Sequence, residues 1–249
     1  GARYMDHELT TMWLSIDPMS DKYPSISPYS YCAWNPMKLV DPDGRDVWEI
    51  NKKGAITRVE KSDKTTLYSV DKQGKRTGRF VELTNDDLVN QLSKNKKSFA
   101  VTDAEGTVLQ KANLHTATST NKEDIVKLFD FAAKNTDVEW GLYAFQKESD
   151  VKYGIATQEL SDRAPSSSVF KDLQDWNLTS IVHSHARPGN KQDEVGSLYG
   201  DRCVAQKYAC SFYGVYMAKS QNLYRVGSKG TVSYVGKQNG YQSLMKHIK

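Results

Sequence analysis

Two histidines stand two residues apart at the end of an apolar run, Ile181-Val182-His183-Ser184-His185. Because successive side chains of a β-strand point to opposite faces, His183 and His185 share one face of the predicted strand. Asp201 follows beyond a glycine-rich loop, at the expected start of a helix. Two imidazoles and one carboxylate with a fourth position open are typical of catalytic zinc. The alternative is a strand that merely ends in polar residues.

Hydrolysis at a zinc site also needs a carboxylate that takes a proton from water and returns it to the leaving group. Glu139 is the candidate, near the start of the apolar and aromatic strand predicted over 138–145. A buried carboxylate is costly unless it is solvated or paired. Glu139 therefore indicates either an exposed strand edge or a functional site.

The elements that must position these residues form an α/β pattern from about residue 118 onward. Thr120-Asn121-Lys122-Glu123 has the form of a capping box, and Ile125, Leu128, Phe129 and Ala132 follow at helical spacing. Alternating and apolar runs predict strands over 138–145, 151–157, 179–185, 212–217, 222–226 and 231–235. A short helical stretch is predicted over 170–176 and a helix over 201–211. This order of elements indicates a single α/β sandwich.

The preceding region, residues 46–84, has the pattern of two β-hairpins. Strands over 46–50 and 55–59 flank Asn51-Lys52-Lys53-Gly54, and strands over 67–70 and 79–83 flank Asp71-Lys72-Gln73-Gly74. No residue pattern in these hairpins suggests chemistry. The region over 46–117 is therefore interpreted as a connector or accessory sheet.

Length and composition limit the function classes. The chain has 249 residues, 38% of them hydrophobic, and a formal net charge of +4, which fits one or two folded domains. No apolar run approaches the roughly 18 residues that span a membrane, and no signal peptide begins at Gly1, so we expect a fragment of a longer protein. The small charge favours solvated surfaces over a nucleic-acid interface.

Three cysteines, Cys32, Cys203 and Cys210, are too few for a disulfide framework. Cys203 and Cys210 lie seven residues apart in the helix predicted over 201–211. Both are therefore expected on its core face as small buried hydrophobic residues.

Residues 1–45 hold most of the seven prolines, interleaved with aromatic residues, which predicts short strands and tight turns. The ordered run of motifs resembles the closing part of an Rhs repeat-associated core: Trp13 to Pro18, Tyr29 to Pro36 and Asp41-Pro42-Asp43-Gly44. That resemblance implies an upstream β-shell in the same polypeptide and a C-terminal toxin cargo. In some such families a DPxG segment contributes an autoproteolytic site. Asp41–Gly44 matches one half of that pattern, whereas Asp17-Pro18-Met19-Ser20 lacks the glycine, so self-cleavage stays open.

Glu139, the triplet His183-Ser184-His185, Ser197 and Asp201 together resemble the JAMM motif of the JAB/MPN metallopeptidases, over about residues 118–235. The resemblance implies that His183, His185 and Asp201 bind one zinc ion per chain. It also implies that Glu139 acts as general base and then general acid. Ser197 would donate a hydrogen bond to the oxyanion of the tetrahedral intermediate.

The spacing departs from the family motif in one loop. Eleven residues, Ala186 to Gly196, separate His185 from Ser197, which is longer than usual. Asp193 stands where the family serine would fall without an insertion. An ionised carboxylate cannot donate a hydrogen bond, so Asp193 is kept only as a reserve metal ligand.

Together these interpretations predict an α+β chain: an Rhs-core remnant over 1–45, a β-hairpin connector over 46–117 and a JAB/MPN-like sandwich, a mixed sheet flanked by helices, over 118–249. The expected activity is zinc-dependent hydrolysis of a peptide or isopeptide bond by the toxin tip of an Rhs-type polymorphic toxin. The expected partners are a protein or peptide substrate, a cognate immunity protein and the upstream Rhs shell, without nucleic acid or a membrane span. The expected location is a secreted effector delivered into the cytoplasm of a target cell. Specificity is expected to lie in 159–168 and 186–200.

Two other functions remain open from the sequence. Two histidines and Asp201 could hold a divalent ion in a nuclease, since many Rhs cargos are nucleases, although no HNH-like order and no basic cluster accompany the histidines. A JAB-like interaction domain without activity is the other, although such a domain would be expected to have lost a ligand or the base.

Overall fold

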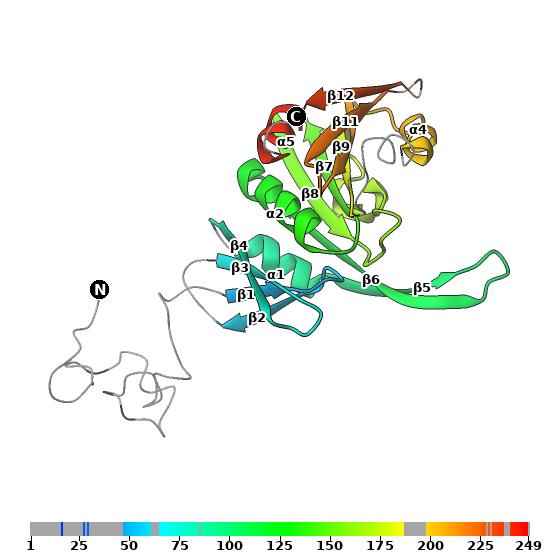
Figure 1. Ribbon diagram of the computed structural model, residues 1–249. Coiled ribbons are helices and arrows are strands. Elements are labelled where there is room, and N and C mark those ends of the chain that lie inside the picture. The colour runs from blue at the N-terminus through cyan, green and yellow to red at the C-terminus, as the bar shows by residue number, and fades with distance from the viewer. Residues whose placement is uncertain are drawn as a thin grey trace. The chain divides into compact units, whose positions relative to one another are not determined.

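The structure, a computed structural model, describes residues 16, 27, 29, 47–60, 65–84, 86–186, 198–227, 229, 231–236 and 240–248. The chain divides into two units, Gly1–Arg45 and Asp46–Lys249. The motifs that resemble an Rhs core, Asp41–Gly44 among them, lie outside the described residues. The helices and strands among the described residues belong to the second unit (Figure 1).

The first sheet of this unit has four strands, in the order β2-β1-β3-β4. These strands are β1 (Val47–Ile50), β2 (Ile56–Glu60), β3 (Thr65–Val70) and β4 (Arg76–Leu83). Both predicted hairpins are present, because β1 pairs with β2 and β3 with β4 in antiparallel fashion. Turn chemistry explains the first one: the Asn51 carboxamide accepts hydrogen bonds from the backbone N–H groups of Lys53 and Ala55. Gly54 closes the turn at φ +83°, which favours glycine.

The second sheet has eight strands, in the order β12-β11-β10-β9-β7-β8-β6-β5. These are β5 (Lys96–Thr102), β6 (Val108–Ser119), β7 (Trp140–Lys147), β8 (Asp150–Thr157), β9 (Asn177–His185), β10 (Phe212–Met217), β11 (Asn222–Val226) and β12 (Val232–Gly236). The sheet is mixed, since β9 and β10 run parallel while the other neighbours are antiparallel. Strand β6 runs through residues 117 and 118, so this sheet joins the region expected as a connector to the sandwich.

Four α-helices accompany the sheets within the described residues: α1 (Asp87–Lys94), α2 (Lys122–Asn135), α4 (Tyr199–Ala205) and α5 (Gly240–His247). Helix α2 begins one residue later than the predicted capping box implies. Its N-cap is Asn121, whose side chain accepts a hydrogen bond from the Asp124 backbone N–H at 3.2 Å. The stretch over 170–176 contains one 3₁₀ turn, Lys171–Leu173, just after another at Ser167–Val169. None of the described helices is long and apolar enough to cross a membrane.

The helix that carries Asp201 is shorter than predicted, and the surroundings of Cys203 and Cys210 differ from the prediction. Helix α4 ends at Ala205, not at Ser211. Cys203 is exposed, so the prediction that it packs into the core is wrong. Cys210 lies beyond the helix, partly buried, with its thiol 3.4 Å from the Phe212 carbonyl oxygen.

The large sheet has an apolar layer on each face. On one face, helices α2 and α5 pack over the strands (Figure 1), and Phe129, Val182, Tyr216 and Leu244 belong to that layer. The other face carries a second cluster, which includes Tyr143, Ile181, Leu198, Tyr213 and Val215. Because side chains alternate along β9, His183 and His185 lie on the face of this second cluster, and Ser184 lies on the α2 side. The predicted α+β class with a mixed sheet and flanking helices agrees with this architecture.

Candidate metal centre

Strand β9 carries the histidine pair in the middle of the sheet. His183 lies opposite Gly141 of the antiparallel strand β7 and opposite Val215 of the parallel strand β10. The two imidazole rings stand with their centroids 5.1 Å apart, and their Nε2 atoms are 3.2 Å apart. Both Nε2 atoms therefore point toward the same small volume.

Asp201 approaches the same point from the first turn of α4. Its Oδ1 atom lies 2.9 Å from His183 Nε2, and its Oδ2 atom lies 3.3 Å from His185 Nε2. Burial alone would raise the pKa of Asp201, but the hydrogen bonds and charges of His183 and His185 outweigh burial and hold that pKa well below its usual range. The carboxylate is therefore ionised and available as a ligand at neutral pH.

These distances can be compared with what a metal ion requires. Zinc–nitrogen bonds of about 2.0–2.1 Å in a tetrahedron place the ligand atoms roughly 3.3 Å from one another. The separations among the two Nε2 atoms and the Asp201 carboxylate are 2.9, 3.2 and 3.3 Å. Asp201 Oδ2 is buried and has no hydrogen-bond partner of good geometry among the described residues. A buried lone pair of this kind, beside two facing nitrogen atoms, fits a divalent metal ion.

Glu139 stands beside the pair, immediately before β7. Its side chain is buried, and its Oε1 atom lies 3.9 Å from His185 Nε2. One ligand atom each from Glu139, His183 and His185 lie within 4.8 Å of one another, so this group too could hold a metal ion. Glu139 is farther from the imidazoles than Asp201 is, which suits a base beside the ion better than a ligand.

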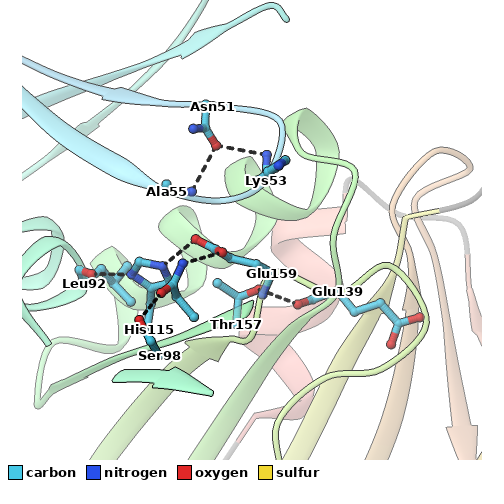
Figure 2. A network of polar contacts seen from close by, with 10 residues as sticks. Asn51, Lys53, Ala55, Leu92, Ser98, His115, Glu139, Thr157 and Glu159 are labelled. Atoms are coloured by element: carbon cyan, nitrogen blue, oxygen red, sulfur yellow. Dashed lines mark hydrogen bonds and ion pairs between the residues drawn. The ribbon is translucent and has the colours of Figure 1, made fainter. Parts of the chain in front are cut away.

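The backbone of Glu139 is held by the turn that follows β8. Its N–H donates to the Leu160 carbonyl oxygen at 2.8 Å, and its own carbonyl oxygen accepts from the Thr157 hydroxyl at 2.8 Å. Figure 2 shows the Glu139 side chain extending away from this anchorage. The main chain is thereby fixed while the carboxylate stays directed toward the histidines.

Tyr213 of β10 lies behind the first histidine. Its hydroxyl is 3.5 Å from His183 Nδ1, and the two rings meet edge to face with centroids 5.7 Å apart. Burial, followed by the charge of Asp201, raises the pKa of Tyr213 far above its ordinary value, so this hydroxyl stays protonated. When His183 uses Nε2 as a ligand atom, Nδ1 carries the hydrogen and Tyr213 offers the acceptor.

A cavity of about 450 Å³ opens over these residues. Its walls include aromatic and apolar side chains, contributed by Tyr143, Ile181, Val204, Tyr208 and Tyr213. Residues 162–166, within the segment expected to carry specificity, line the cavity as well. The described residues thus line this cavity with both apolar and polar groups.

The structure brings together four of the five residues proposed from the sequence: Glu139, His183, His185 and Asp201. Ser197 and the reserve ligand Asp193 lie outside the described residues. Thr157, Leu160 and Tyr213 were missed, because their roles depend on strand pairing and on a turn that no spacing in the sequence reveals.

Comparison with known proteins bears on the same segment. Residues 117–206 match the family model described as JAB-like toxin 1. The match supports a JAB-like toxin domain in this part of the chain, and it includes Glu139, both histidines and Asp201. No curated protein and no solved structure matches the chain. The match does not extend to residues 1–45.

Proposed function

We propose that this domain is a zinc-dependent peptidase or isopeptidase that acts as a toxin. The observation that carries the proposal is the convergence of His183 Nε2, His185 Nε2 and the Asp201 carboxylate within 3.3 Å of one another, with Glu139 next to them. Two nitrogens and one oxygen with a free position are the donor set of hydrolytic zinc sites.

In this proposal His183, His185 and Asp201 hold the ion. When bound, zinc would acidify a water molecule and polarise the carbonyl of the bond to be cleaved. Glu139 accepts a proton from the attacking water as the C–O bond forms, and then delivers that proton to the amine nitrogen as the C–N bond breaks. Tyr213 keeps the His183 ring in one orientation. Ser197 is proposed as a further donor to the oxyanion.

The match to a JAB-like toxin family supports the toxin half of the proposal. The proposed context is an Rhs-type polypeptide, in which residues 1–45 end the shell and this domain is the secreted effector. The proposed partners are a protein substrate in the target-cell cytoplasm and an immunity protein of the producing cell.

The first test is zinc content per chain. The protein is purified without chelator, zinc is then added back, and the bound zinc is measured. We expect about one zinc in the wild type, and loss of the metal in His183→Ala and Asp201→Ala. His247→Ala is the matched control, because His247 stacks on Phe212 away from the site and should leave zinc binding intact. Failure of the wild type to bind zinc would refute the metallopeptidase.

The second test is cleavage of a mixture of folded and unfolded proteins, followed by mass spectrometry of new amino termini. Glu139→Gln should bind zinc yet cleave nothing, because an amide cannot take the proton. Cleavage of added DNA or RNA without any peptide cleavage would indicate the nuclease instead.

A further inference from the structure

A buried polar pair lies on the far side of the turn that holds Glu139. His115 of β6 is 2% exposed, and its two ring nitrogens contact the Leu92 carbonyl oxygen at 2.9 Å and Glu159 Oε1 at 3.0 Å. Each ring nitrogen therefore has an oxygen atom within hydrogen-bond distance. The other carboxylate oxygen of Glu159 accepts from the Asn113 side chain at 2.7 Å. Figure 2 shows the pair at the centre of this network.

The backbone of Glu159 is in a conformation that needs such support. Its φ is +57°, in the left-handed region that residues other than glycine rarely adopt. A residue persists there only where its surroundings hold it. Two side chains of β6, His115 and Asn113, contact the Glu159 carboxylate and hold it here, and the Leu92 backbone carbonyl oxygen of α1 in turn contacts the His115 ring.

The residues flanking Glu159 are the ones that hold Glu139. Thr157 precedes it and donates to the Glu139 carbonyl oxygen, while Leu160 follows it and accepts from the Glu139 N–H, both at 2.8 Å. The Thr157 hydroxyl also accepts from the Glu159 N–H at 3.4 Å. A change in the Glu159 backbone would therefore act on both hydrogen bonds that locate Glu139.

We infer that His115 and Glu159 are positioning residues for Glu139. Their pair fixes the turn over 157–160, and the turn sets the distance between the Glu139 carboxylate and the histidines. Neither residue touches the histidine pair or Asp201, so their effect is on Glu139 and not on the ligands. The functional half of this inference rests on the proposed role of Glu139 as the base, whereas the anchoring itself does not.

The experiment measures hydrogen exchange of the Glu139 amide by NMR in the metal-free domain, together with zinc affinity by chelator competition. Glu159→Gln is the first variant, because it keeps the size of the side chain but replaces one of the two oxygens, which contact His115 and Asn113, with a donor group. His115→Leu removes the pair, and Glu159→Gln serves if that variant does not fold. Tyr216→Phe is the control, since it removes a different, partly buried hydrogen bond, from Tyr216 to Asp130 at 2.6 Å.

In Glu159→Gln we expect the Glu139 amide to exchange about tenfold faster than in the control, as local opening of one turn predicts. Zinc affinity should stay within about threefold of wild type, while kcat on any cleaved protein falls about 10- to 100-fold with KM unchanged. Equal exchange in variant and control would overturn the inference. A loss of zinc affinity as large as the loss of kcat would also overturn it, because the pair would then support the whole site and not Glu139 in particular. Absence of zinc in the wild type would refute the proposed function and leave the exchange comparison valid.

Discussion

Ser184, the residue between the two histidines, accepts a 3.0 Å hydrogen bond from the backbone N–H of Trp140, the residue that follows Glu139. The bond crosses from β9 to β7 on the face opposite the candidate metal centre. It joins the strand that carries the histidines to the strand that begins just after the proposed base. The relative position of base and ligands thus depends on a side chain that faces away from both.

Substitution of this serine should show that dependence. Ser184→Ala leaves the buried Trp140 N–H without a partner, which costs about 1–3 kcal/mol. We expect a lower urea midpoint with an unchanged slope, and a fall in kcat if Glu139 is the base. A decrease of less than about 0.5 kcal/mol in the free energy of unfolding would show that another acceptor replaces the Ser184 hydroxyl.

Tyr213 is expected to tune metal affinity. Tyr213→Phe keeps the ring and removes the acceptor next to His183 Nδ1, so zinc should bind about tenfold more weakly in chelator competition. Tyr208→Phe is the matched control, because Tyr208 stacks on Tyr213 and lines the same cavity, whereas the hydroxyl beside His183 belongs to Tyr213. Equal affinities in the two variants would contradict a role for the Tyr213 hydroxyl.

Replacement of either of two glycines near the cavity by alanine should change the stability of the domain, in opposite directions. A Cβ at Gly154 would stand 2.6 Å from the Phe170 ring, whereas a Cβ at Gly200 has no neighbour within 4 Å. Gly154→Ala should destabilise the domain by about 1–3 kcal/mol. Gly200→Ala, in helix α4, should stabilise it by about 0.5–1 kcal/mol. Thermal unfolding of both variants provides the check.

The two described cysteines should differ in reactivity toward a thiol reagent. Burial raises the pKa of the Cys210 thiol, whereas Cys203 is exposed. Peptide mapping after brief alkylation at pH 8 should find Cys203 labelled and Cys210 largely unlabelled. Comparable labelling of both would mean that the segment after α4 opens readily.

The raised pKa of Cys210 also has a consequence for stability. The unfolded chain loses this proton at a lower pH than the folded domain does. The contribution of the protonated Cys210 thiol to the free energy of unfolding is therefore complete below the pKa of the unfolded chain, about 8.5. It is lost as the pH rises through the pKa of the folded domain. Cys210→Ser should flatten this alkaline decline in urea unfolding.

Much of the site could be predicted because alternation along a strand is visible in the sequence. The run Ile181–His185 placed both histidines on one face, and the bounds of β10 and β11 agree with the predicted strands. The start of α4 at Tyr199 was not predictable, since Asp201 suits both an N-cap and a first turn.

The remaining features depend on contacts between distant segments. Tyr213 reaches His183 because β10 pairs in parallel with β9, and parallel partners carry no local signal of their register. Helix α1 and the β5–β6 ribbon were not predicted, and His115 lies in that part of the chain. The turn at Glu159 has a positive φ without glycine, so the usual marker of such a turn is missing.

The alternation along β9 has a consequence for misfolding. If β9 shifted by one residue against its neighbours, Ser184 would enter the cavity and both imidazoles would enter the apolar layer beneath α2. The same shift would leave the Trp140 N–H unpaired and remove every proposed metal ligand of this strand at once. A chain with this error would be both unstable and unable to bind zinc, so no stable but inactive population with a displaced β9 should accumulate.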